Sequence, residues 1–202
     1  MNSIKNIDNF YFIGIGGIGM SALARYFNLE GKIVFGYDKT PSEITSMLIQ
    51  EGVTIQFKDE VSLIPELIQK NKKVLIVCTP AISKKNNILS WLNAKEYSIT
   101  KRSELLGEIS KNSICLAVAG THGKTTTSAI LGHLLASCNM PVTAFLGGVT
   151  ENYNSNLIYK GTQNNGSNPP QFDKSLDTTP TISAYTINVG GSDTKKKLKV
   201  IR

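Results

Sequence analysis

The first 110 residues alternate between short apolar runs and segments with helical spacing, and this alternation limits the fold more than any other feature. Runs typical of β-strands cover 10–15, 32–37 and 74–78, and helix-like segments cover about 17–30, 41–51 and 87–94. Strands that alternate with helices favour a mostly parallel sheet with crossover helices. The sequence therefore predicts an α/β fold that begins with a Rossmann-like parallel sheet.

A glycine-rich loop joins the first predicted strand to the first predicted helix. It contains Gly14, Gly16 and Gly19 in the pattern GxGxxG, and Asp38 follows at the end of the second strand. Such glycines let the backbone approach a diphosphate at the start of a helix, while the acidic residue is placed to bond a ribose. The alternative is that the glycines only permit tight packing. The pattern predicts a nucleotide diphosphate ligand, and it does not separate NAD from other nucleotides.

A second glycine loop follows a second apolar run, 114–119, which reads as a strand. The loop GTHGKT, residues 120–125, opens a predicted helix over 125–137, and a further strand is predicted over 142–146. In a phosphate-binding loop the backbone N–H groups surround the phosphates, the lysine neutralises their charge and the hydroxyl reaches Mg²⁺. Lys124 is therefore the predicted catalytic residue, Thr125 the predicted Mg²⁺ ligand, and Thr126 a further phosphate contact. The usual loop of this kind has four residues between its glycines, and this one has two.

The two histidines and three cysteines carry weaker signals. His122 lies inside the second loop, where it faces either the ligand or the solvent, and His133 is expected on the following helix as a surface or boundary residue. The cysteines are odd in number and form no CxxC pair. Neither a disulfide framework nor a zinc site is predicted.

Composition excludes several classes of protein. The net charge is +7, but residues 159–202 hold seven Lys or Arg against three Asp, so a basic tail carries most of the excess and no nucleic-acid partner is expected. No apolar run is long enough to span a bilayer, so no membrane insertion is expected. The N-terminus has no signal-peptide pattern. These features favour a cytoplasmic protein, and the oligomeric state stays open.

The composition changes after residue 158. The segment 159–202 is rich in Asn, Gly, Ser, Thr, Pro and Lys, and it reads mostly as loop or disorder, with one possible strand over 181–189. Three parts are predicted: a Rossmann-like domain over 1–108, the start of a P-loop α/β ATPase domain over 109–158, and a divergent, poorly ordered tail over 159–202.

Two motifs in this order, GIGGIGMSALA and AGTHGKTTT, resemble those of the Mur ligases of peptidoglycan synthesis. The segments GYDKT at 36–40, CTPAI at 78–82, KRSELLG at 101–107 and TAFLGGVTENYNSNL at 143–157 support the resemblance, which covers residues 8–158. It implies a three-domain, ATP-dependent ligase with ATP and Mg²⁺ as cofactors. Its implied partners are UDP-N-acetylmuramate, L-alanine and ATP. Its implied reaction joins L-alanine to the carboxylate of the sugar substrate through an acyl phosphate.

The resemblance also implies roles for individual residues. The residues implied to bind the UDP-sugar are Gly14, Gly16, Gly17, Ile18, Gly19, Met20, Ser21, Asp38, Thr79 and Ala81. The residues implied to bind ATP are Gly120, Thr121, His122, Gly123, Lys124, Thr125 and Thr126.

The sequence departs from the family pattern in its last part. The family has an acidic, Mg²⁺-binding motif where this chain has NPPQFDKS, so Asn168 stands in place of the glutamate. Pro169 and Pro170 would also remove donors from a central strand. The expectation is an inactive fragment of a ligase. A non-catalytic nucleotide-binding module and a nicotinamide-dependent oxidoreductase are the alternatives.

Overall fold

The computed structural model describes residues 4–71, 73–83, 85–111 and 113–160. The chain divides into two compact units, Met1–Ile109 and Ser110–Arg202. The predicted boundary after residue 108 lies one residue before this division. The predicted tail, apart from residues 159 and 160, lies outside the described residues.

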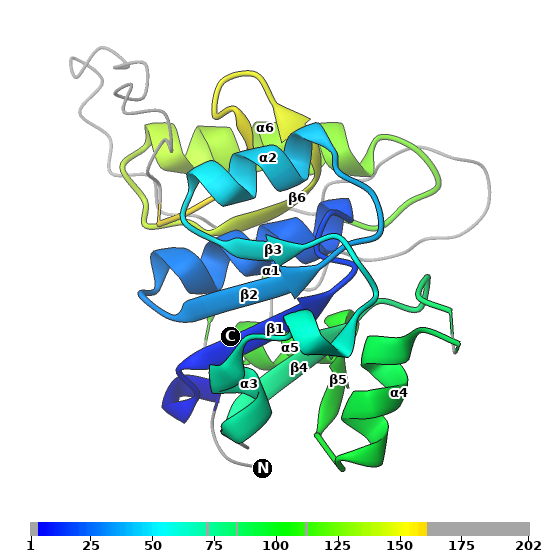
Figure 1. Cartoon of the computed structure of the whole chain (residues 1–202). Helices are drawn as coiled ribbons and strands as arrows, with labels where there is room; N and C mark the ends of the chain where they lie inside the picture. The colour runs from blue at the N-terminus through cyan, green and yellow to red at the C-terminus, as the bar shows by residue number, and fades with distance from the viewer. Residues whose placement is uncertain (1–3, 72, 84, 112, 161–202) are drawn as a thin grey trace. The chain divides into compact units, whose positions relative to one another are not determined.

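The first unit contains a parallel five-stranded sheet, as the alternating pattern predicted (Figure 1). The order across the sheet is β3-β2-β1-β4-β5, so the chain builds outward from β1 in one direction and then returns to the other side. The strands are β1 (Asn9–Ile13), β2 (Ile33–Tyr37), β3 (Thr54–Gln56), β4 (Val74–Cys78) and β5 (Ile99–Lys101). The predicted α/β fold class is confirmed.

Helices follow most of these strands. They are α1 (Ile18–Leu29), α2 (Glu43–Gln50), α3 (Glu66–Lys70), α4 (Asn87–Ala94) and α5 (Arg102–Ser110), with 3₁₀ turns η1 (Ile4–Asn6) and η2 (Val61–Leu63). Caps set two of the starts: Ser42 accepts from the Thr45 N–H before α2, and Asn86 accepts from the Leu89 N–H before α4. The sequence did not single out β3, β5, α3 or α5, since three of these elements have five residues or fewer.

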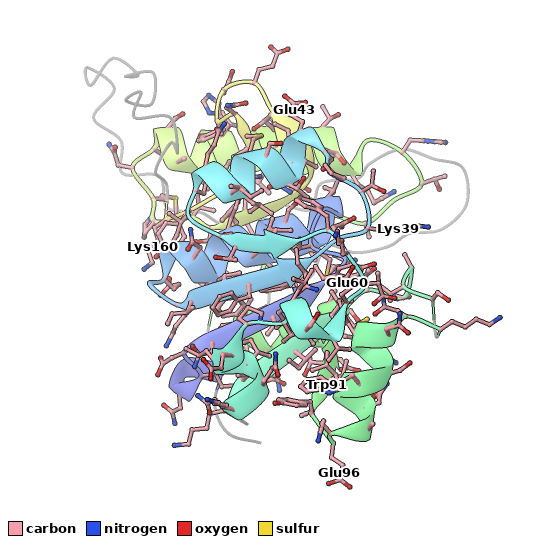
Figure 2. All side chains as sticks on the ribbon, viewed as in Figure 1. Lys39, Glu43, Glu60, Trp91, Glu96 and Lys160 are labelled. Carbon is pink, nitrogen blue, oxygen red and sulfur yellow. The ribbon has the colours of Figure 1, made fainter. Side chains whose placement is uncertain are left out.

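Both faces of the sheet are buried. On one face, Tyr11 and Ile13 of β1 pack with α3 and α4. Trp91 of α4, labelled in Figure 2, stacks on Tyr97. Side chains alternate across a strand, so Phe10 points to the other face, where its ring stacks on Phe27 of α1 with centroids 3.9 Å apart. All five residues of β1 are therefore buried, as expected for the central strand of a parallel sheet.

A buried ion pair links α1 to the end of α2. The Arg25 side chain is fully buried, and its Nε donates to Glu51 Oε1 at 2.8 Å and to Oε2 at 3.0 Å. The Glu51 side chain is 35% exposed. The Asn28 side-chain amide also donates to the Glu51 carbonyl oxygen at 2.8 Å. These contacts hold α2 against α1, the helix that follows the first glycine loop.

The described part of the second unit contains α6 (Lys124–Ser137), β6 (Ala144–Thr150) and β7 (Ser155–Ile158). The two strands pair antiparallel, and α6 packs on them through Ala136, Leu146, Tyr153 and Ile158. His133 is half-buried, and its Nδ1 lies 3.0 Å from the Tyr153 hydroxyl. The prediction that His133 is a surface or boundary residue is confirmed, since its ring is half-buried and contacts Tyr153 in the turn between the strands.

One predicted strand is wrong. Residues 114–119 form no strand; Cys115 alone makes an isolated bridge, and Ile114 is 66% exposed. An apolar run becomes a strand only when neighbouring strands bond its backbone, and β6 pairs with β7 instead. The following helix is confirmed, and the next strand begins at Ala144 rather than 142 and extends to Thr150.

Within the described residues, no helix is both long enough and apolar enough to cross a membrane. Cys78, Cys115 and Cys138 are free thiols.

Candidate functional site

The first candidate site lies at the carboxyl ends of the parallel strands. Strand order reverses between β1 and β4, and open α/β sheets bind ligands in the crevice at such a switch point. Gly14 follows β1, Asp38 follows β2 and Thr79 follows β4. The topology therefore brings three predicted site residues, far apart in the sequence, to one edge of the sheet.

The loops after β1 and β4 are in direct contact. Gly14 has φ +84°, and a Cβ added to it would lie 2.5 Å from Thr79 Cγ2. The Thr79 N–H also donates to the Ile13 carbonyl oxygen at 3.4 Å. Gly14 is thus required both for its left-handed backbone and for the close approach of Thr79. Ala81 is exposed, two residues beyond Thr79.

Ile15 anchors the glycine loop to strand β2. Its side chain is fully buried and lies on Gly36 of β2, where an added Cβ would lie 2.9 Å from Ile15 Cβ. The N–H groups of Gly14 and Ile15 both donate to the Tyr37 carbonyl oxygen, at 2.8 and 3.1 Å. Gly36 therefore makes room for the loop, a role that the GxGxxG pattern did not indicate.

Replacing Gly36 with valine is expected to displace Ile15 and to lower the free energy of unfolding by about 1–3 kcal/mol, the usual cost of overpacking a core. Urea unfolding followed by the fluorescence of Trp91, the one tryptophan of the chain, measures it. Gly31→Ala is a control on the same β1–α1–β2 segment, because no atom lies within 4 Å of a Cβ added there. Its cost comes from the φ of +75° alone. An unfolding midpoint for Gly36→Val equal to that of the unchanged chain would contradict the packing role.

Asp38 bonds the glycine loop itself. Its Oδ2 accepts from the Gly16 N–H at 2.8 Å, and its Oδ1 accepts from the Thr40 N–H at 3.2 Å. A Cβ at Gly16 would lie 2.9 Å from Asp38 Oδ2 and 3.0 Å from Thr45 Cγ2. In this structure Asp38 therefore orders the loop, and a contact with a ribose stays a prediction.

The remaining predicted residues of this loop differ in exposure. Gly17 is exposed, and Ile18 and Gly19 are partly exposed at the start of α1. Met20 and Ser21 are buried, and the Ser21 hydroxyl donates to the carbonyl oxygens of Gly17 and Ile18 at 3.1 and 3.0 Å. Their side chains support the loop from below, and their ligand roles stay predictions.

Buried hydroxyl and thiol groups lie beneath this edge. Burial, and then the neighbouring Asp59, raises the pKa of Tyr37, and burial raises the pKa of the Cys78 thiol. Burial is also the largest cause of the raised pKa of Tyr11, whose hydroxyl donates to Gln56 Oε1 at 3.2 Å. All three groups are neutral at pH 7, so they add no charge to the site.

The second candidate site is the loop before α6. Gly123 has φ +76° and ψ 0° and occupies the N-cap position, without a side-chain cap. In the described part of the chain, no backbone N–H from Thr121 to Thr126 donates a hydrogen bond. Six consecutive N–H groups are thus available at a helix start, where the helix dipole also favours an anion.

The Lys124 side chain bonds the backbone of its own loop. Its Nζ donates to the carbonyl oxygens of Gly120 and Thr121, at 2.7 and 3.0 Å. The ammonium therefore lies at the centre of the loop while the loop's N–H groups remain available. His122 is exposed within the same turn.

Thr125 lies against β6. A Cβ added to Gly147 would lie 2.6 Å from Thr125 Oγ1, and one added to Gly148 would lie 3.5 Å from Thr125 Cγ2. The sequence did not assign Gly147 to the site, although it lies in the segment that supports the family resemblance. Its lack of a side chain is the signal that could have revealed it.

The residues fit Mg²⁺ bound together with a nucleotide, but not Mg²⁺ held by protein alone. No group of three or more His, Cys, Asp or Glu residues that could hold a metal ion exists among the described residues. Mg²⁺ commonly takes its oxygen ligands from phosphates, waters and one or two side chains. Thr125 can supply one such oxygen.

The chain is similar to known ligases. The model of the Mur ligase family, catalytic domain, matches residues 9–113, half of the chain. The chain is 52% identical over 186 residues to a UDP-N-acetylmuramate--L-alanine ligase of Flavobacterium psychrophilum, a match that covers 91% of this chain and 41% of the relative. A second ligase of that name, from Christiangramia forsetii, is 48% identical over 188 residues, covering 92% and 42%.

Among solved structures, the UDP-N-acetylmuramate-alanine ligase of Thermotoga maritima matches with a TM-score of 0.69 at 28% identity, covering 77% of this chain and 35% of that one. This chain spans about two fifths of the length of the curated relatives it matches. The glycine loop, the parallel sheet and the sequence matches agree: the chain belongs to the Mur ligase family.

Proposed function

We propose that this chain provides the nucleotide-sugar-binding and ATP-binding parts of a ligase that joins L-alanine to UDP-N-acetylmuramate in peptidoglycan synthesis. The observation that carries the proposal is the loop 120–126, where six backbone N–H groups are available around the Lys124 ammonium. Two relatives named UDP-N-acetylmuramate--L-alanine ligase, 52% and 48% identical, supply the substrate class.

The chemistry of such a ligase explains why this loop is needed. A carboxylate is a poor acyl donor, and bound ATP would supply the phosphoryl group that turns it into an acyl phosphate. Lys124 would stabilise the negative charge on the transferring group, and the loop N–H groups would hold the phosphates in place. The Thr125 hydroxyl would give Mg²⁺ one oxygen ligand. ATP and a nucleotide-activated sugar as substrates support a cytoplasmic place for this reaction.

The first unit would hold the UDP end of the sugar substrate. Gly14 contacts Thr79 at the switch point of its sheet, where open α/β sheets bind ligands, and the exposed Gly17 lies in the same loop. The ribose contact of Asp38 and the contacts of Ile18 and Ala81 belong to the same proposal.

We propose further that the 202-residue chain by itself binds nucleotides without turnover. Asn168 stands where the family has a Mg²⁺-binding glutamate, and an amide does not replace the charge of a carboxylate. Positioning and electrostatic stabilisation provide most of phosphoryl-transfer catalysis, so this loss is expected to reduce turnover by orders of magnitude.

A ligand panel followed by thermal unfolding tests the proposal. Ligands that bind only the folded state raise the melting temperature, so UDP-N-acetylmuramate and ATP with Mg²⁺ are each expected to stabilise the chain, and NAD is not. Stabilisation by UDP-N-acetylmuramate alone would instead support a non-catalytic sugar-binding module. Stabilisation by NAD alone would support an oxidoreductase, and either result would overturn the ligase assignment. Phosphate release that depends on both ligands and L-alanine would contradict the expected lack of turnover.

A further inference from the structure

The two glycine loops differ in how much of their backbone is free. In the first loop, Gly14 and Ile15 donate to the Tyr37 carbonyl oxygen, Gly16 donates to Asp38, and Gly17 donates to the Gly14 carbonyl oxygen at 3.3 Å. The loop before α6 keeps six N–H groups available and contains a lysine. In the first loop, the N–H groups from Gly14 to Gly17 are all used within the fold, and there is no lysine. The loop also contacts the negative charge of Asp38. A diphosphate bound there needs a positive charge from outside the loop.

Arg102 is placed to supply that charge. Its side chain crosses Gly19 in the first turn of α1, because a Cβ added to Gly19 would lie 2.5 Å from Arg102 Nη1, 3.0 Å from Cζ and 3.1 Å from Cδ. Among the atoms nearest to the four loop glycines, those of Arg102 are the only ones from a cationic side chain. Any side chain at position 19 would push the guanidinium away from the loop.

The guanidinium is free to bind a ligand. Arg102 is exposed, and within the described ranges its side chain makes neither a hydrogen bond nor an ion pair. It directly follows β5, which is parallel to β4, so it emerges at the same edge of the sheet as Thr79 and Asp38. By contrast, Lys39, the cation next to Asp38, is exposed and extends outward from the ribbon (Figure 2).

We infer that Arg102 binds the diphosphate of the nucleotide sugar at the first glycine loop, an assignment that rests on the proposed function and adds a residue to it. A guanidinium presents several N–H donors in a plane and pairs with two phosphate oxygens at once. It also offsets the repulsion between the diphosphate and the Asp38 carboxylate. Gly19 is a glycine because this arginine crosses it.

Isothermal titration of the full chain with UDP-N-acetylmuramate tests the inference. Arg102→Ala is expected to weaken binding by about tenfold or more, since a charge-assisted pair with phosphate is lost. Arg102→Met is expected to weaken it to a similar extent, because it keeps the apolar stem over Gly19 and removes only the charge. Lys101→Ala removes the neighbouring exposed charge and is expected to bind as the unchanged chain does.

The dependence of affinity on salt gives a second readout. Interactions between exposed charges are screened by salt, so affinity is expected to fall less steeply with ionic strength in Arg102→Met than in the unchanged chain. If Arg102→Met retains full affinity and the unchanged salt dependence, Arg102 has only a packing role and the inference is overturned. If the unchanged chain binds ATP but not UDP-N-acetylmuramate, the substrate assignment itself fails, and the role of Arg102 fails with it.

Discussion

Replacing Glu51 with alanine is expected to lower the free energy of unfolding of the first unit by about 3 kcal/mol. The change leaves the fully buried Arg25 guanidinium without the carboxylate that its Nε bonds. Removing one partner of a buried ion pair typically costs about 3–5 kcal/mol. The lower end applies because the Glu51 side chain is 35% exposed and water can partly replace it.

Urea unfolding followed by Trp91 fluorescence measures this loss, because that tryptophan lies in α4 of the first unit. Asp8→Ala is the matched control: it breaks the Lys32–Asp8 pair of 2.7 Å, in which the Asp8 side chain is 75% exposed. Exposed pairs contribute at most about 1 kcal/mol, so the control is expected to stay close to the unchanged chain. Equal losses for the two substitutions would show that the burial of Arg25 does not decide the effect.

Replacing Lys124 with alanine is expected to weaken ATP binding by about 12- to 140-fold. The ammonium lies inside the loop, and a hydrogen bond to a charged group contributes about 1.5–3 kcal/mol, which corresponds to that range at 1.4 kcal/mol per factor of ten. The carbonyl oxygens of Gly120 and Thr121 belong to exposed residues, so water can bond them after the substitution. The fold is therefore expected to keep its stability.

Isothermal titration with ATP and Mg²⁺ measures the affinity, and the melting temperature without ligand checks the fold. Lys160→Ala is the control, because it removes an exposed lysine of the same unit that lies outside the loop. Unchanged ATP affinity in Lys124→Ala would mean that the loop does not hold the phosphates. Weaker ATP binding in both variants would point to net charge rather than to the loop.

Local patterns in the sequence were enough for the frame of the first unit. An apolar run followed by glycines and then by helical spacing predicted β1, the loop and α1, and the same reasoning placed β4 and α4 at the residues where they are found. These elements are readable because strand and helix periods and N-cap residues act over a few neighbouring positions. The second loop and α6 followed from the same kind of signal.

Contacts between distant segments could not be read in this way. Three close approaches pair residues that only the strand order or the packing brings together. They are Gly36 with Ile15, Gly19 with Arg102, and Gly147 with Thr125. The run 114–119 has an apolar pattern typical of a strand, yet apart from the isolated bridge of Cys115 it forms no strand in the described structure.

The fold class, the two glycine loops and the family could be predicted from sequence alone, because each rests on residues close together along the chain. The groups that each loop can offer to an anion depend instead on how separate elements pack. In the first loop, Asp38 accepts from one N–H group, and the Arg102 side chain lies over Gly19. In the second loop, the N–H groups remain available around Lys124. Hydrogen bonds and close approaches depend on where separate elements end in space, which no local pattern of residues encodes.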